Sequence, residues 1–505
     1  MSKKVLPENL MNSVLGYLYD TLCTGDDVAP KSEDNYLSWC TPGIPMMKED
    51  FDYMSEGLMG VRKADSEPPE SDEEESSDQD INRELSQNVA GKYQAAENFS
   101  RICDMIPDTS GVQGDVTMNT WNVENTLSHA YEQVLRFSQV ADFGIDDETK
   151  KKVERLRGLL QEKKIKKDLI TDEETEVIEE SPLVKKYNEK KQEYISTVLE
   201  YNTHRVNALA GQDPAAVHYW SLNAPVLRNK VQGAMNDWVT NGYKNEYERI
   251  AAFIRQVESR SMALLKAQYI DDLEKSKLGG ISSGSNFIYT TLVPGSFAES
   301  AGWTQFNFSK NEFNSKYSYD KKKGSGRVGL SLGVFNIGGG GGYEKKERHS
   351  EIDVSNFRLT FKMAQVPIVR PGININFLTS NYWRFVQNNP EFNEQMVSDG
   401  KTPPNGMIPA IPTTCIFVKD LYLHFGESHR IMDEVKEVKS GGGALSWGPF
   451  AIGGKYKHES FDRDTESNSE SQGIRIPGMQ LIGFKCHMMP KSPNPHPDIE
   501  EDAWI

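Results

Sequence analysis

"SGRVGLSLGVFNIGG" (residues 325–339) recurs in related form as "SGGGALSWGPFAIGG" (residues 440–454). The two stretches align without a gap, and nine of their fifteen positions are identical. Unrelated stretches of ordinary composition would share roughly one position. In the first copy apolar residues alternate with Gly and Ser, which predicts a strand with one apolar face and one face small enough for another backbone to approach. The repeat therefore predicts two related glycine-rich β-hairpins.

The sequence around the repeat also has the period of two that is typical of strands. Strand patterns occur at 306–308, 357–363, 421–425 and 479–484. Each copy of the repeat is followed by a strand that ends in F-K-x-x-x-x-P, at 361–367 and at 484–490. We therefore expect an antiparallel β-domain over residues 279–490, in which a hairpin and a following strand are duplicated.

The preceding part of the chain, residues 82–278, has apolar residues at spacings of three and four, which predicts helices. Between them lies a highly charged stretch with thin apolar seams, typical of a long-helix bundle or an extended helical hairpin. Pro182, Pro214 and Gly242 are expected breaks between helices. The remaining segments are a short helical N-terminal segment (1–63), an acidic disordered linker (64–81) and a Pro-rich acidic tail (491–505). The predicted fold class is α+β.

The composition limits the function. A net charge of -17 argues against nucleic acid as a partner, because a phosphate-binding surface needs a basic excess. The N-terminus lacks the apolar core of a signal peptide, and no run approaches 18 apolar residues. Five cysteines without C-x-x-C spacing are typical of a reducing compartment. We expect synthesis in the cytoplasm and, if the protein leaves the cell, a signal-independent route.

No motif predicts catalysis. Residues 324–329 match G-x-G-x-x-G, but a dinucleotide site needs a helix after the glycines, and a strand pattern follows here. The triplet DFG at 142–144 precedes this loop, which is the reverse of the order in kinases. The nine histidines include no H-E-x-x-H pair. We therefore expect no enzyme activity, no catalytic residues, no cofactor and no metal.

The two hairpin tips have basic flanks in an acidic chain. Residues 316–348 contain eight Lys or Arg and three acidic residues, and residues 436–458 contain four Lys and one Glu. An apolar tip with basic shoulders suits shallow insertion into an anionic membrane, and tryptophan is favoured at that interface. The expected tip contacts are Leu330, Leu332, Val334, Phe335, Ile337, Leu445, Trp447, Phe450 and Ile452. The expected headgroup contacts are Lys321, Lys322, Lys323, Arg327, Lys455 and Lys457.

The predicted function is a non-enzymatic membrane-interacting protein of toxin or effector type, and oligomerisation would extend shallow insertion toward a pore. Residues 326–343 barely accommodate two membrane-crossing strands of about 9 to 11 residues each, so shallow insertion is the better fit. Two other readings of the tips stay open. They suit contacts with other protein subunits, including copies of this chain, in a structural subunit or cargo of a larger assembly. They also suit packing within the domain.

Overall fold

The computed structural model describes most of the chain. Its described residues are 4–5, 7–23, 35–58, 78–107, 109, 126–141, 147–167, 174–209, 214–258, 262–281, 284–300, 302–309, 335–338, 343–346, 352–353, 356–387, 392, 395–424, 440, 444–458, 461–465, 467–470 and 473–505. Helices and antiparallel sheets both occur in quantity, which confirms the predicted α+β class.

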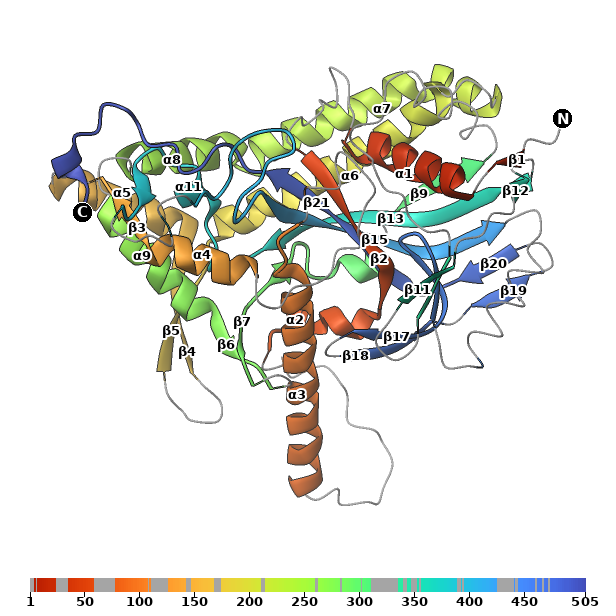
Figure 1. Ribbon diagram of the computed structural model, residues 1–505, viewed down its shortest axis with the longest axis horizontal. Coiled ribbons are helices and arrows are strands. Elements are labelled where there is room, and N and C mark those ends of the chain that lie inside the picture. The colour runs from red at the N-terminus through yellow and green to blue at the C-terminus, as the bar shows by residue number, and fades with distance from the viewer. Residues whose placement is uncertain are drawn as a thin grey trace.

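An antiparallel sheet of eight strands forms the centre of the molecule (Figure 1). Its longest strand, β15 (Ala410–His424), pairs along one edge with β13 (Arg358–Val369) and along the other with β21 (Met479–Met488). The sheet is completed by β2 (Asn35–Met46), β8 (Thr291–Leu292), β9 (Thr304–Ser309), β19 (Asn468–Glu470) and β20 (Gly473–Ile476). The Pro- and Met-rich stretch near the N-terminus, for which the sequence predicts no strand, thus forms β2 beside β21.

Each face of the central sheet carries its own apolar core, because successive side chains of a strand point to opposite faces. On one face, Ile416 and Phe361 pack in a cluster with helix α1 (Pro7–Cys23). On the other face, the ring of Phe417 lies 5.5 Å from that of Phe51. That second core is covered by η1 (Lys48–Phe51), α2 (Asp52–Glu56), η3 (Phe297–Glu299) and the C-terminal part of α3 (Asp78–Cys103).

The helices between the acidic stretch and the β-rich part begin and end near the predicted breaks. Pro182 is the first residue of α6 (Pro182–Leu209), and Pro214 is the first residue of α7 (Pro214–Thr240), because proline fits the first helical turn. Gly242 lies between α7 and α8 (Lys244–Glu258). The other helices of this region are α4 (Leu127–Arg136), α5 (Asp147–Leu160) and α9 (Met262–Ser276).

Short strands also occur in this helical region, where the charged sequence predicts only helix. They are β3 (Ser138–Val140), β4 (Gln161–Lys167), β5 (Glu174–Glu180) and β6 (Lys277–Gly279). β4 pairs with β5, while β3 pairs with β14 (Trp383–Phe385), and β6 pairs with β7 (Asn286–Ile288). The helix α11 (Ile375–Leu378), the pair of β1 (Lys4–Val5) with β12 (Ile352–Asp353), and η5 (Glu501–Ala503) complete the fold.

The C-terminal tail packs beside the β3–β14 strand pair. Trp504 bridges to Ala141, and Ile505 exchanges backbone hydrogen bonds of 3.1 and 3.0 Å with Val140. The guanidinium of Arg384 lies 4.6 Å from the Trp504 ring centre and also binds Glu501 at 2.7 Å. Of the predicted acidic linker, residues 64–77 lie outside the described residues, and α3 begins at Asp78.

Candidate functional site

The two copies of the repeat contribute neighbouring strands to a second, five-stranded antiparallel sheet. Its order is β11 (Tyr343–Lys346), β10 (Phe335–Gly338), β16 (Ala444–Trp447), β17 (Phe450–His458) and β18 (Phe461–Thr465). The first copy supplies β10, and the second supplies β16 and the start of β17. Ile337 is opposite Leu445 in the register of β10 and β16. We call this unit the glycine sheet.

The strands that follow the two copies are also placed alike. The F-K strand after the first copy is β13, the one after the second copy is β21, and both pair antiparallel with β15. The duplicated sequence units therefore meet twice, directly at β10 and β16 and across β15 in the central sheet.

A two-residue turn joins β16 to β17 and requires glycine. Gly448 has φ of +55°, which side-chain-bearing residues rarely adopt. A Cβ atom at this position would lie 2.5 Å from Cε of Met11 in α1. Next in the turn, the carbonyl of Pro449 approaches Gly43 of β2 more closely than a Cβ there would permit. The turn is thus enclosed between α1 and β2.

The second tip is not exposed in this conformation. Leu445, Trp447, Phe450 and Ile452 are all buried, in the same core as α1 and one face of the central sheet. Trp447 lies 5.7 Å from Phe357, and Phe450 lies 5.6 Å from Phe361, measured between ring centres. The apolar face that the sequence assigns to a lipid or a partner is covered here by the protein's own aromatic side chains.

The other predicted contact residues are described only in part. Leu330, Leu332, Val334, Lys321, Lys322, Lys323 and Arg327 lie outside the described residues. Phe335 and Ile337 belong to β10 and Lys457 belongs to β17, but their side chains are not described. Lys455 is exposed on β17, as a headgroup contact requires.

Side chains attach the glycine sheet to the rest of the molecule. The amide of Gln480 in β21 donates to the Ala451 carbonyl and accepts from the Ala451 N–H, both at 2.8 Å. Arg463 of β18 forms an ion pair with Asp50 of η1. Burial raises the pKa of Asp50, and the bonds to the Met47 N–H and to Arg463 oppose that rise.

Within the described residues, no strand of the glycine sheet forms a ladder with the eight-stranded sheet. The apolar core, the Gln480 amide and the Arg463–Asp50 pair therefore hold it in place, rather than continuous backbone hydrogen bonding. Inside the sheet, the Tyr456 hydroxyl donates to the Leu445 carbonyl and ties β17 to β16.

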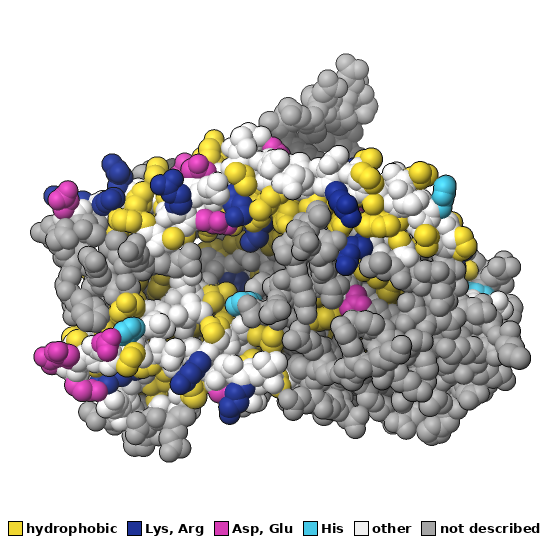
Figure 2. Space-filling model, turned by 90° about the horizontal axis from the view of Figure 1, so that it is seen from above, with side chains coloured by type: hydrophobic (Ala, Val, Ile, Leu, Met, Phe, Trp, Pro, Cys, Tyr) yellow, Lys and Arg dark blue, Asp and Glu magenta, His cyan; other side chains and the backbone are white. Residues whose placement is uncertain are grey.

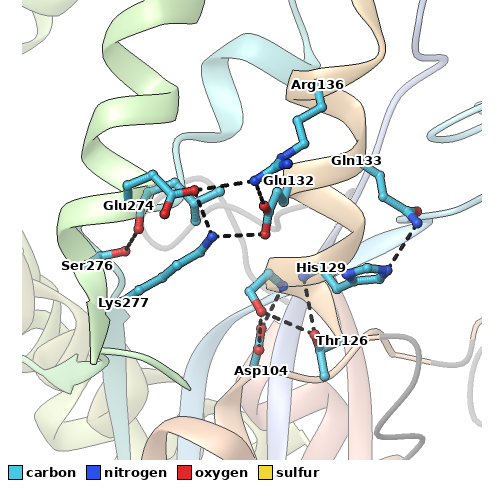
Figure 3. Close-up of polar contacts among 11 residues, drawn as sticks. Asp104, Thr126, His129, Glu132, Gln133, Arg136, Glu274, Ser276 and Lys277 are labelled. Atoms are coloured by element: carbon cyan, nitrogen blue, oxygen red, sulfur yellow. Dashed lines mark hydrogen bonds and ion pairs between the residues drawn. The ribbon is translucent and has the colours of Figure 1, made fainter. Parts of the chain in front are cut away.

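A cluster of Asp, Ser, Thr and His at the start of α4 has the residue types of a catalytic site but a different geometry (Figure 3). Asp104 accepts from the Ser128 backbone N–H at 2.7 Å and from its hydroxyl at 2.5 Å. Thr126 accepts from the His129 N–H at 3.2 Å, and the His129 ring points instead to Gln133. These bonds satisfy backbone donors of the first helical turn, so the cluster is a helix cap.

Burial raises the pKa of the Asp104 carboxyl, and the bonds from Ser128 oppose that rise. Lys277, the first residue of β6 directly after α9, binds Glu132 of α4 at 3.1 Å and Glu274 of α9 at 2.8 Å (Figure 3). These ion pairs link two helices that share an apolar core.

The described residues contain no group of three or more His, Cys, Asp or Glu placed to hold a metal ion. Among them, too, no helix combines the length and the apolar character needed to cross a bilayer. All five cysteines are buried thiols without disulfide partners.

Comparison with models of known protein families, with curated proteins and with solved structures finds no match to this chain.

Proposed function

We propose that this is a non-enzymatic, membrane-interacting protein of toxin or effector type that stores the second glycine-rich hairpin in its core. The observation that carries the proposal is the attachment of the glycine sheet, which shares no described ladder with the central sheet. The unit can therefore separate by loss of side-chain contacts while its own backbone hydrogen bonds stay intact. Backbone groups that stay paired avoid the cost of several kcal/mol that each unpaired N–H or C=O would meet in lipid.

The hydrophobic free energy favours neither the protein core nor the lipid surface strongly as the location of the hairpin. A large apolar side chain gains about 1.5 to 3 kcal/mol on leaving water. Trp447 and Phe450 obtain that gain in the present core and would obtain it again in a bilayer. The small contacts that hold the sheet, such as the Gln480 amide, then decide how readily it moves. Because β16 has only four residues, the proposal is shallow insertion and not a spanning barrel.

The alternative is a structural subunit or cargo of a larger protein assembly. The two edges of the described glycine sheet favour it, because β11 and β18 each have one pairing partner in this sheet. An unpaired strand edge is a template for a strand of another chain. In that case the buried core would stay intact and the sheet would extend sideways.

The test is dye release from phosphatidylcholine vesicles that contain phosphatidylserine. Gln480→Ala removes both bonds to Ala451, so we expect it to speed release several-fold over wild type at equal amounts of bound protein. Gln192→Ala is the matched control, because the Gln192 amide donates at 2.5 Å to the Gln365 carbonyl, away from the glycine sheet. It should leave the release rate unchanged.

If Gln480→Ala does not fold, Arg463→Gln provides a second way to loosen the sheet, since it breaks the pair with Asp50. Wild-type protein that binds vesicles but releases no dye, with neither variant releasing any, would exclude hairpin insertion. Self-association without lipid that involves the β11 or β18 edge would favour the assembly alternative.

A further inference from the structure

Helix α7 carries an exposed apolar stripe on its outer surface. Tyr219, Leu222 and Val226 recur at spacings of three and four, which places them on one face of the helix. Their exposed fractions are 42%, 63% and 55%, and the nearby Val217 is 41% exposed. Figure 2, which views the molecule from the side where α7 lies in Figure 1, shows hydrophobic side chains along this surface with Lys and Arg among them.

The opposite face of α7 packs on α6 and leaves the stripe exposed, although the Tyr219 ring also lies 4.7 Å from that of His204 in α6. Leu227 and Val231 are buried in a small core with Tyr201 of α6. Two ion pairs fasten the same helix pair, Lys230 to Glu200 at 3.1 Å and Lys190 to Asp237 at 2.8 Å. The stripe therefore belongs to a helix that is already anchored by its other side, and its exposure does not depend on an unfolded or loose segment.

The charge of this surface differs from that of the whole chain. The chain has 74 acidic residues in 505, yet residues 214–236 contain none. The charged side chains of this stretch are Arg228 and Lys230, both exposed, with His218 also at the surface. On the adjoining part of α6, Glu200 and Arg205 balance each other in charge. A protein of net charge -17 thus presents a locally basic, apolar surface here.

We propose that the outer face of α7 docks on an anionic lipid surface, with the Tyr219–Leu222–Val226 stripe immersed in the interface and Arg228 among the headgroups. An apolar stripe beside basic residues is the pattern of helices that lie in the plane of a membrane. Tyr219 is a residue type favoured at that depth. Because residues 214–236 contain no acidic side chain, this stretch meets less repulsion from anionic lipid than the rest of the chain would.

The α7 site rests on the proposed function for its partner, a lipid surface, and goes beyond it by using a different part of the molecule. It shares the lipid surface as the partner, but it needs no release of the glycine sheet. Docking through α7 leaves Trp447 and Phe450 in the core. Vesicle binding without dye release by wild type, Gln480→Ala or Arg463→Gln would therefore reject hairpin insertion but not the α7 site, so the two proposals can fail separately.

The test is co-sedimentation of the full chain with phosphatidylcholine vesicles, with and without phosphatidylserine. We expect wild type to sediment with the anionic vesicles and Leu222→Glu to bind them roughly ten-fold more weakly. Leu264→Glu is the matched control, because Leu264 is 54% exposed on α9 and outside the stripe. It adds the same charge to a similarly exposed leucine and should bind as wild type does.

The electrostatic part has its own pair of variants. Arg228→Gln should weaken binding several-fold and reduce its dependence on salt, whereas Lys491→Gln removes one charge from an exposed site on the tail and should change little. Equal binding by wild type and Leu222→Glu would overturn the proposal, as would a failure of wild type to bind anionic vesicles at low salt. Lipid-free self-association that Leu222→Glu abolishes would assign the stripe to a protein contact instead.

Discussion

Gly448 occupies a turn of the second hairpin that only glycine fits without strain. Its φ of +55° and the Met11 side chain beside it both exclude a Cβ atom. We expect Gly448→Ala to lower the free energy of unfolding by about 1 to 3 kcal/mol, through backbone strain and displacement of Met11. Urea denaturation measures this. Gly233→Ala in α7, where a Cβ meets nothing, should instead raise stability by about 0.5 to 1 kcal/mol.

Asp272 predicts a pH dependence of stability. Burial raises its pKa to about 6, the neighbouring Asp271 adds to the rise, and Lys275 and Arg157 oppose it. Because the folded pKa lies above the unfolded value, the ionised carboxylate disfavours the folded state. The protonated carboxyl therefore contributes to stability below a pH of about 4, and this contribution is lost as the pH rises through about 6.

Asp272→Asn should therefore raise the free energy of unfolding at pH 7 by about 1 kcal/mol, after allowance for the partial exposure of this side chain. The difference from wild type should vanish below a pH of about 4. Urea denaturation across this range tests the sign. Asp498→Asn, at a carboxyl that is 87% exposed, is the control for the removal of one surface carboxylate. A gain that is equal at every pH would contradict the assignment to Asp272.

At the scale of elements, the proline within α7 is expected to weaken that helix. Pro225 lies inside the helix, where it removes a backbone donor and crowds the preceding turn, at about 3 kcal/mol relative to alanine in a helix interior. Because Pro225 is exposed, Pro225→Ala removes no buried contact. We expect it to raise the free energy of unfolding by about 1 to 3 kcal/mol, measured by chemical denaturation. A decrease in the free energy of unfolding would mean that the packing of Leu227 needs a bend at this proline.

Individual strands of the β-rich part could be predicted from local sequence, but which strands pair with each other could not. The alternating pattern from Phe357 to Met363 predicts the start of β13, and the structure buries Leu359, Phe361 and Met363 on one face. No local pattern indicates that β2, from the N-terminal segment, pairs with β21. Pairing between segments more than 400 residues apart in a chain of 505 depends on which faces are left uncovered after local folding.

At the scale of the whole molecule, the two sheets should open separately. The central sheet is buried on both faces, whereas the glycine sheet is joined to it through side chains. Hydrogen exchange followed by mass spectrometry should show amides of β16 and β17 exchanging roughly ten-fold faster than those of β15. Equal protection would mean that the two sheets unfold as one cooperative unit, and it would count against the stored hairpin.

The sequence by itself determined the α+β class, the helix breaks at Pro182 and Pro214, and the relation between the two glycine-rich copies. These are local properties, because period, proline geometry and identity can be read within a few residues. Only the tertiary structure decided that Leu445 and Trp447 lie inside while Leu222 lies outside. An alternating strand shows that one face is apolar, but what covers that face depends on distant segments, here α1 and the aromatic face of the central sheet.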